Sequence, residues 1–103
     1  MTSERVIPAE CRTMAEVRQG VDALDREIVK LLGERFRYMD AAARIKPVRE
    51  AVRDDARKAE VIANVSAHAA AAGVPADLAA SLYEQLVEAS IAYEFGRFDE
   101  RPR

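Results

Sequence analysis

Residues 17–46 read VRQGVDALDREIVKLLGERFRYMDAAARIK, and this stretch decides the fold. From Met14 onward, side chains recur in alternating steps of three and four residues, which is typical of one face of an α-helix. The apolar positions are 14, 17, 21, 24, 28, 31, 38, 42 and 45, and Arg35 occupies the single gap between them. Thr13 and Glu16 match a capping box, and Pro47 disfavours helical backbone angles at the residue before it. The sequence therefore predicts one long helix from about residue 13 to residue 45 or 46.

Two shorter helices are predicted after a loop. Asp54 or Asp55 is a candidate N-cap for the second helix, which Gly73 would end as a left-handed C-cap. Pro75 suits the first turn of a third helix that ends near Arg97. We expect an all-α fold of three helices over residues 13–98, a flexible N-terminal arm at residues 1–12 and a C-terminal tail at residues 99–103.

Composition excludes several classes of function. The formal net charge of −2 is spread along the 103 residues without a basic stripe, so neither nucleic acid nor a membrane surface is an expected partner. With only Cys11 and His68, the chain has neither an internal disulfide nor a cysteine and histidine set for a metal. No signal-like segment or run of about 18 apolar residues is present, which predicts a cytoplasmic protein without a membrane span.

The length of the first helix predicts an oligomer. At 1.5 Å per residue a helix of 32 residues extends about 48 Å, whereas a compact monomer of this size has a radius of gyration near 13 Å. Two shorter helices cover only part of such a helix. Its apolar stripe is therefore expected to pack against the same helix of a second subunit, in a helical homodimer.

Four basic residues suggest an anion site. Arg35 and Lys46 are eleven residues apart, which places them within about 20° of the same helix face and about 16 Å apart along the axis. Arg57 lies just beyond the loop and could close the same pocket. Arg18 lies about 25 Å from Arg35 along the helix, so it would reach such a ligand only from the other subunit of an antiparallel dimer.

Each of these cations also has an ordinary structural interpretation. An arginine on an apolar stripe often extends its guanidinium to solvent, and a lysine at a helix C-terminus complements the helix dipole. Glu94, in the segment SIAYEF at residues 90–95, is a carboxylate on an apolar helix face. It could pair with Arg97 one turn later on an exposed surface.

In combination, these residues resemble the all-helical chorismate mutase family, a dimer of intertwined three-helix chains. The resemblance covers about residues 13–98. It rests on the first-helix pattern of Arg18, Leu24-Asp25, Arg35 and Lys46, on the segment VRDDARK at 52–58, and on LYEQLVEASIAYE at 82–94. The last segment places Ser90 and Glu94 at the two inward polar positions of the family.

The resemblance implies a Claisen rearrangement of chorismate to prephenate without cofactor, metal or covalent intermediate. Arg35 and Arg18 of the partner subunit would hold the two substrate carboxylates, with Arg57 assisting. Lys46 would donate to the ether oxygen as its bond breaks, beside Glu94, and Asp54 and Ser90 would line the substrate site. Such a site holds a flexible dianion in a reactive conformer and meets the charge that develops on oxygen.

Two departures from the family pattern are notable. Lys58 stands where many relatives have a carboxylate, so recognition of the ring hydroxyl could differ. Glu94 stands where bacterial members commonly have Gln, and a carboxyl donates a hydrogen bond only when protonated. Burial would favour that neutral acid as the working form, whereas nearby Lys46 would oppose it.

Two alternatives stay open at this point. The family's relatives include isochorismate-pyruvate lyases, which form salicylate and pyruvate from isochorismate. The short loop between Lys46 and Arg57 and the entry CRTMAEVR are somewhat similar to those enzymes. A non-catalytic helical dimer that binds a ligand or protein partner is the second alternative, against which the complete set of four cations argues.

Overall fold

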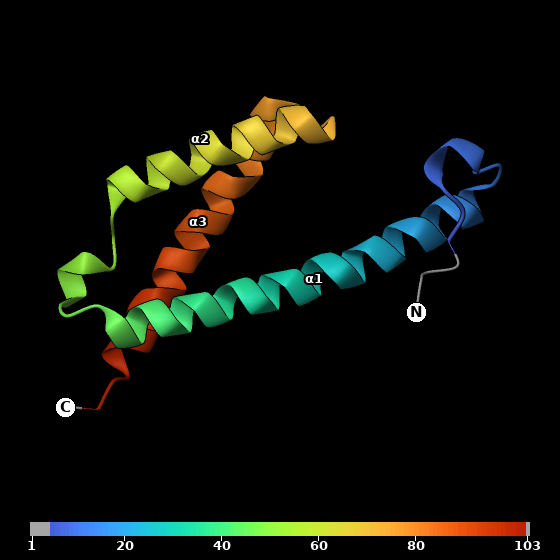
Figure 1. Cartoon of the computed structure of the whole chain (residues 1–103). Helices are drawn as coiled ribbons and strands as arrows, with labels where there is room; N and C mark the ends of the chain where they lie inside the picture. The colour runs from blue at the N-terminus through green and yellow to red at the C-terminus, as the bar shows by residue number, and fades with distance from the viewer. Residues whose placement is uncertain (1–4, 103) are drawn as a thin grey trace. The chain divides into compact units, whose positions relative to one another are not determined.

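A computed structural model describes residues 5–102, and this part of the chain is helical without strands. A short 3₁₀ helix, η1 (Pro8–Glu10), precedes the long helix α1 (Met14–Ile45). A second 3₁₀ helix, η2 (Arg49–Ala51), lies in the loop before α2 (Asp55–Ala72) and α3 (Ala76–Asp99). Figure 1 shows these elements along the chain. The predicted all-α class and the three helices are confirmed.

The start of α1 confirms the predicted capping box. The Glu16 amide donates to Thr13 Oγ1 at 3.1 Å, and the Thr13 amide donates to Glu16 Oε1 at 3.1 Å. A further hydrogen bond from the Arg12 amide to the same oxygen, at 2.8 Å, lowers the pKa of Glu16. These contacts satisfy amides that would otherwise lack partners at a helix N-terminus.

Contacts within the chain group it into two units, residues 1–37 and residues 38–103, and α1 runs through the boundary. In the first unit, the apolar stripe of α1 is exposed to solvent. Its members include Met14, Val21, Leu24, Ile28 and Leu31, which are 42–63% exposed. The small side chain of Ala23 is buried.

In the second unit, α2 packs against α3 (Figure 1). The short helix η2 also contacts α3. Asp54 is the N-cap of α2, and Gly73 ends this helix with φ of 76°, as predicted. Pro75 is the N-cap of α3 rather than part of its first turn. The helix then continues two residues past the predicted end at Arg97.

Small residues make up much of the buried surface of the second unit. Ala43, Ala69 and Ala79 are buried together with Val52 and Val87. Small side chains let helix backbones approach closely, but each buries little apolar area. Polar contacts between α3 and the loop that joins α1 to α2 therefore help to hold this loop in position.

The described residues contain no helix long and apolar enough to cross a membrane. Within the same residues, no group of three or more histidine, cysteine, aspartate or glutamate side chains could hold a metal ion.

Candidate active site

A buried ion pair joins the end of α1 to the interior of α3. Lys46 directly follows α1, and its Nζ lies 2.7 Å from Glu94 Oε2. The Glu94 side chain is only 5% exposed, and that of Lys46 is 28% exposed. Lys46 Nζ also donates to the Val52 carbonyl at 3.4 Å, across the connecting loop. The lysine ammonium is therefore held between α3 and the loop.

The contact between Lys46 and Glu94 is electrostatic rather than a well-formed hydrogen bond. The two atoms form an ion pair at 2.7 Å, and Oε2 is buried without a hydrogen bond to any of the described residues. Buried oxygens in folded proteins are normally hydrogen-bonded, and exceptions often occur at functional positions. Glu94 is therefore a candidate for a functional position.

Ser90 lies one turn before Glu94 on α3 and is buried as well. Its hydroxyl donates to the Leu86 carbonyl at 2.7 Å. Glu94 is buried, and the alternative of a surface pair with Arg97 is wrong. Arg97 instead pairs with Asp40 and Glu100, each at 3.0 Å, because its guanidinium reaches solvent while Glu94 faces inward.

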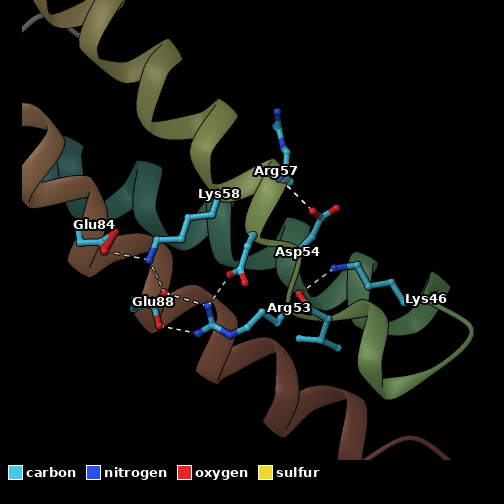
Figure 2. Close-up of polar contacts among 9 residues, drawn as sticks. Lys46, Arg53, Asp54, Arg57, Lys58, Glu84 and Glu88 are labelled. Carbon is cyan, nitrogen blue, oxygen red and sulfur yellow. Dashed lines mark hydrogen bonds and ion pairs between the residues drawn. The ribbon is translucent and has the colours of Figure 1, made fainter.

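Asp54 and Arg57 lie at the start of α2. Asp54 Oδ1 accepts from the Arg57 amide at 3.0 Å, so this carboxylate stabilises the first turn. The Arg57 guanidinium pairs with Glu60 on the same helix and is largely exposed. Figure 2 shows the Arg57 side chain extending away from Lys46. The structure thus brings Asp54 to the Arg57 backbone and leaves the guanidinium on the surface.

Lys58 belongs to an ion-pair network between α2 and α3 (Figure 2). Its ammonium donates to Glu84 at 2.9 Å and to Glu88 at 2.7 Å. Arg53 donates to Glu88 at 2.6 Å and to Asp55 at 3.0 Å. Sequence reasoning missed this role of Lys58, because both glutamates lie on another helix.

The network shifts the pKa values of its members. Hydrogen bonds from Arg53 and then Lys58 lower the pKa of Glu88 to about 2. The same contacts raise the pKa of Lys58, first through Glu88 and then through Glu84. Lys58 is therefore held in its charged form by α3.

The loop that follows Lys46 has two further arginine contacts to α3. Arg49 makes a paired hydrogen bond to Asp99, at 2.9 and 3.2 Å, and its guanidinium lies 4.5 Å from the centre of the Phe95 ring. Arg101, beyond the end of α3, donates to the Ala43 carbonyl at 3.2 Å and to the Lys46 carbonyl at 2.6 Å. Neither arginine was predicted as a site residue, since only the fold brings residues 99–101 to the loop.

The remaining predicted site residues lie in the first unit. Arg18 is exposed on α1, and Arg35 is half-buried on the same helix. Both arginines lie on the part of α1 that belongs to the first unit. The second unit contains the other predicted site residues, which are Lys46, Asp54, Arg57, Ser90 and Glu94.

Comparison with known proteins decides the family. Residues 17–95 match the family model described as chorismate mutase type II, which is most of the chain. The chain belongs to the chorismate mutase type II family. The matched residues include all seven predicted site residues. A curated relative, the isochorismate pyruvate lyase of Pseudomonas aeruginosa, is 31% identical over 85 residues, which cover 82% of this chain and 84% of the relative.

Membership of the chorismate mutase type II family agrees with the chemistry of the second unit. A partly buried ammonium at the end of α1 can donate to an oxygen that gains negative charge. The neighbouring carboxyl can hold that ammonium or, when protonated, donate a bond itself. The family is enzymatic, and the curated relative described above is named a lyase.

Proposed function

We propose that this protein is a chorismate mutase that converts chorismate to prephenate. In this intramolecular reaction the ether carbon–oxygen bond breaks while a new carbon–carbon bond forms, and no atom is gained or lost. The observation that carries the proposal is the buried pair of Lys46 and Glu94, at 2.7 Å. It supplies a donor and a second ionisable group in a chain of the chorismate mutase family.

Lys46 is proposed to donate to the ether oxygen of the substrate. Negative charge develops on this oxygen in the transition state, and a fixed cation stabilises it more than it stabilises the ground state. The contacts of Nζ with Glu94 and the Val52 carbonyl support this role, since they hold the ammonium before substrate binds.

Glu94 is proposed to face the same oxygen. A protonated Glu94 would donate a second hydrogen bond, whereas an ionised Glu94 would orient Lys46. The lack of a hydrogen-bond donor to Oε2 among the described residues supports a ligand contact at this carboxyl.

The two substrate carboxylates are proposed to bind arginines. From the spacing along the sequence and the family pattern, we assign them to Arg35 and to Arg18 of the partner subunit, with help from Arg57. Arg57 would first have to leave Glu60, a contact between two largely exposed groups that costs little to break. Asp54 and Ser90 complete the proposed substrate site.

A homodimer is part of this proposal. The exposed stripe of α1, which includes Val21, Leu24 and Ile28, is suited to pack against the same stripe of a second copy. Burying large apolar side chains would stabilise the dimer by about 25 cal/mol for each Å² removed from water. The dimer would form two equivalent sites.

A lyase acting on isochorismate is the second candidate. It is favoured by the relative from Pseudomonas aeruginosa, which is named an isochorismate pyruvate lyase. This reaction would also use a cationic pocket for a dianion, but it would release pyruvate and leave salicylate.

The product formed from each substrate tests the proposal. Purified protein is incubated with chorismate or with isochorismate, without added metal or nucleotide, and the products are separated by chromatography. We expect prephenate from chorismate at a rate well above the uncatalysed reaction. Salicylate from isochorismate, without prephenate from chorismate, would instead favour the lyase, and no product from either substrate would contradict both.

A further inference from the structure

The last turn of α1 ends at Ile45 and is followed by Lys46 and Pro47. Pro47 lacks a backbone N–H. The last carbonyls of an α-helix have no partners within the helix, and backbone amides just beyond the end often satisfy them. At this position proline removes one of those amides. Carbonyl groups of the turn therefore need a donor from elsewhere.

Arg101 supplies that donor. One nitrogen of its guanidinium, Nη1, donates to the Ala43 carbonyl at 3.2 Å and to the Lys46 carbonyl at 2.6 Å. Its guanidinium carbon lies 4.2 Å from the centre of the Phe98 ring, which restricts the side chain. A cation at this end of the helix also complements the helix dipole.

The Lys46 carbonyl belongs to the residue whose ammonium contacts Glu94 and the Val52 carbonyl. Fixing the main chain of Lys46 limits where its Cβ atom, the first atom of the side chain, can lie. We propose that Arg101 is a positioning residue, which holds the backbone of Lys46 so that its ammonium meets the reacting oxygen. This inference rests on the proposed function of Lys46.

Arg101 lies outside residues 17–95, the part of the chain that matches the family model. The contact is thus made by a part of the chain that the family match does not include. Through Arg101, the segment after α3, which the sequence indicated only as a tail, would have a role in the reaction.

The test compares Arg101→Met with Arg44→Met. Arg44 and Arg101 line the same hollow of about 290 Å³, so both changes remove one positive charge from one place. We expect Arg101→Met to lower kcat on chorismate about 10-fold with KM nearly unchanged, since small displacements of a catalytic group cost up to about 100-fold. Arg44→Met should remain within about twofold of the unmodified protein. Equal kcat values for the two variants would overturn the proposal.

A second comparison separates positioning from a general structural role. In the Lys46→Met background, Arg101→Met should lower kcat no further, because its effect passes through the missing ammonium. The same loss in both backgrounds would show that Arg101 acts on the fold instead. Arg101→Lys, which retains a donor, should recover part of the activity and provides a variant if Arg101→Met does not fold.

A measurement without substrate distinguishes failure of this inference from failure of the proposed function. The NMR signal of the Lys46 side chain in lysine-labelled protein should shift in Arg101→Met and stay in place in Arg44→Met. An unmoved signal would contradict the role of Arg101. Protein that forms no product from either substrate, but shows the shift, would contradict the proposed function while leaving the link from Arg101 to Lys46 intact.

Discussion

At the scale of single residues, Glu94 was an informative position in the sequence, although two interpretations of its side chain were open. A carboxylate on an apolar helix face indicated either a surface pair or an inward-facing group. The structure buries Glu94 and pairs it with Lys46, a partner 48 positions earlier in the chain. Spacing within one helix could predict the burial, whereas the proximity of Lys46 was predicted only through the family resemblance, because the contact depends on how two helices meet.

The protonation of Glu94 gives the first prediction. If the neutral acid donates to the substrate, kcat should fall as the pH rises from acid to alkaline conditions, because ionisation removes the donor. Glu94→Gln should flatten this profile, since an amide donates at every pH. Steady-state rates over this pH range would measure both profiles.

Glu100→Gln is the matched control, since Glu100 is exposed and pairs with Arg97 at the end of α3. Its profile should follow that of the unmodified protein. A Glu94→Gln profile with the same slope as the unmodified protein would contradict the role as an acid. A uniform loss at every pH would instead assign Glu94 to orienting Lys46.

At the scale of elements, helix ends were predicted well and contacts between helices were not. Thr13, Asp54 and Gly73 cap their helices as local sequence chemistry predicted. The role of Lys58 was missed, because its partners lie about 26 to 30 residues away on α3. Capping depends on neighbours within four residues, whereas such a network depends on the packing of α2 against α3.

The network gives a prediction about stability and pH. The folded protein lowers the pKa of Glu88 to about 2, from an ordinary value of 4.5. A carboxylate with a lowered pKa stabilises the folded state above its unfolded pKa, and this contribution is lost as the pH falls toward the folded pKa. Glu88→Gln should therefore lower Tm at pH 7, and the difference from the unmodified protein should close between about pH 4.5 and pH 2.

Thermal unfolding followed by circular dichroism at several pH values would measure this difference. Glu34→Gln, at an exposed position on α1, is the control and should change Tm little at any pH. Because the groups are partly exposed, added salt should also reduce the effect. A Tm difference for Glu88→Gln that persists undiminished at pH 2 would contradict the charge-pair explanation.

At the scale of the whole molecule, periodicity predicted the three helices and the extent of α1. The length of α1 and its exposed apolar stripe both favour a dimer. Periodicity alone could not assign the polar contacts of the loop, since Arg49 and Arg101 reach residues about 50 to 58 positions away.

The proposed sharing of the site between two subunits gives a prediction for mixed subunits. Arg18→Ala and Arg35→Ala chains should each be nearly inactive alone. A heterodimer would combine Arg35 of one chain with Arg18 of the other and keep one intact site. After exchange at equal concentrations, random pairing should restore about a quarter of the unmodified activity.

Activity after exchange, with subunit mixing confirmed by mass spectrometry, would measure the recovery. A mixture of two preparations of the same variant is the control and should recover nothing. Mixed dimers without recovered activity would contradict a site shared between subunits.

Lys46 is proposed to stabilise the transition state of the chorismate rearrangement. The most direct measurement is kcat for prephenate formation by the unmodified protein, Lys46→Met and Arg44→Met, with folding verified by circular dichroism. Loss of one preorganised donor typically costs about 100- to 1000-fold, so we predict a loss of this size in Lys46→Met and nearly full activity in Arg44→Met. A folded Lys46→Met variant that forms prephenate as fast as the unmodified protein would contradict this role of Lys46.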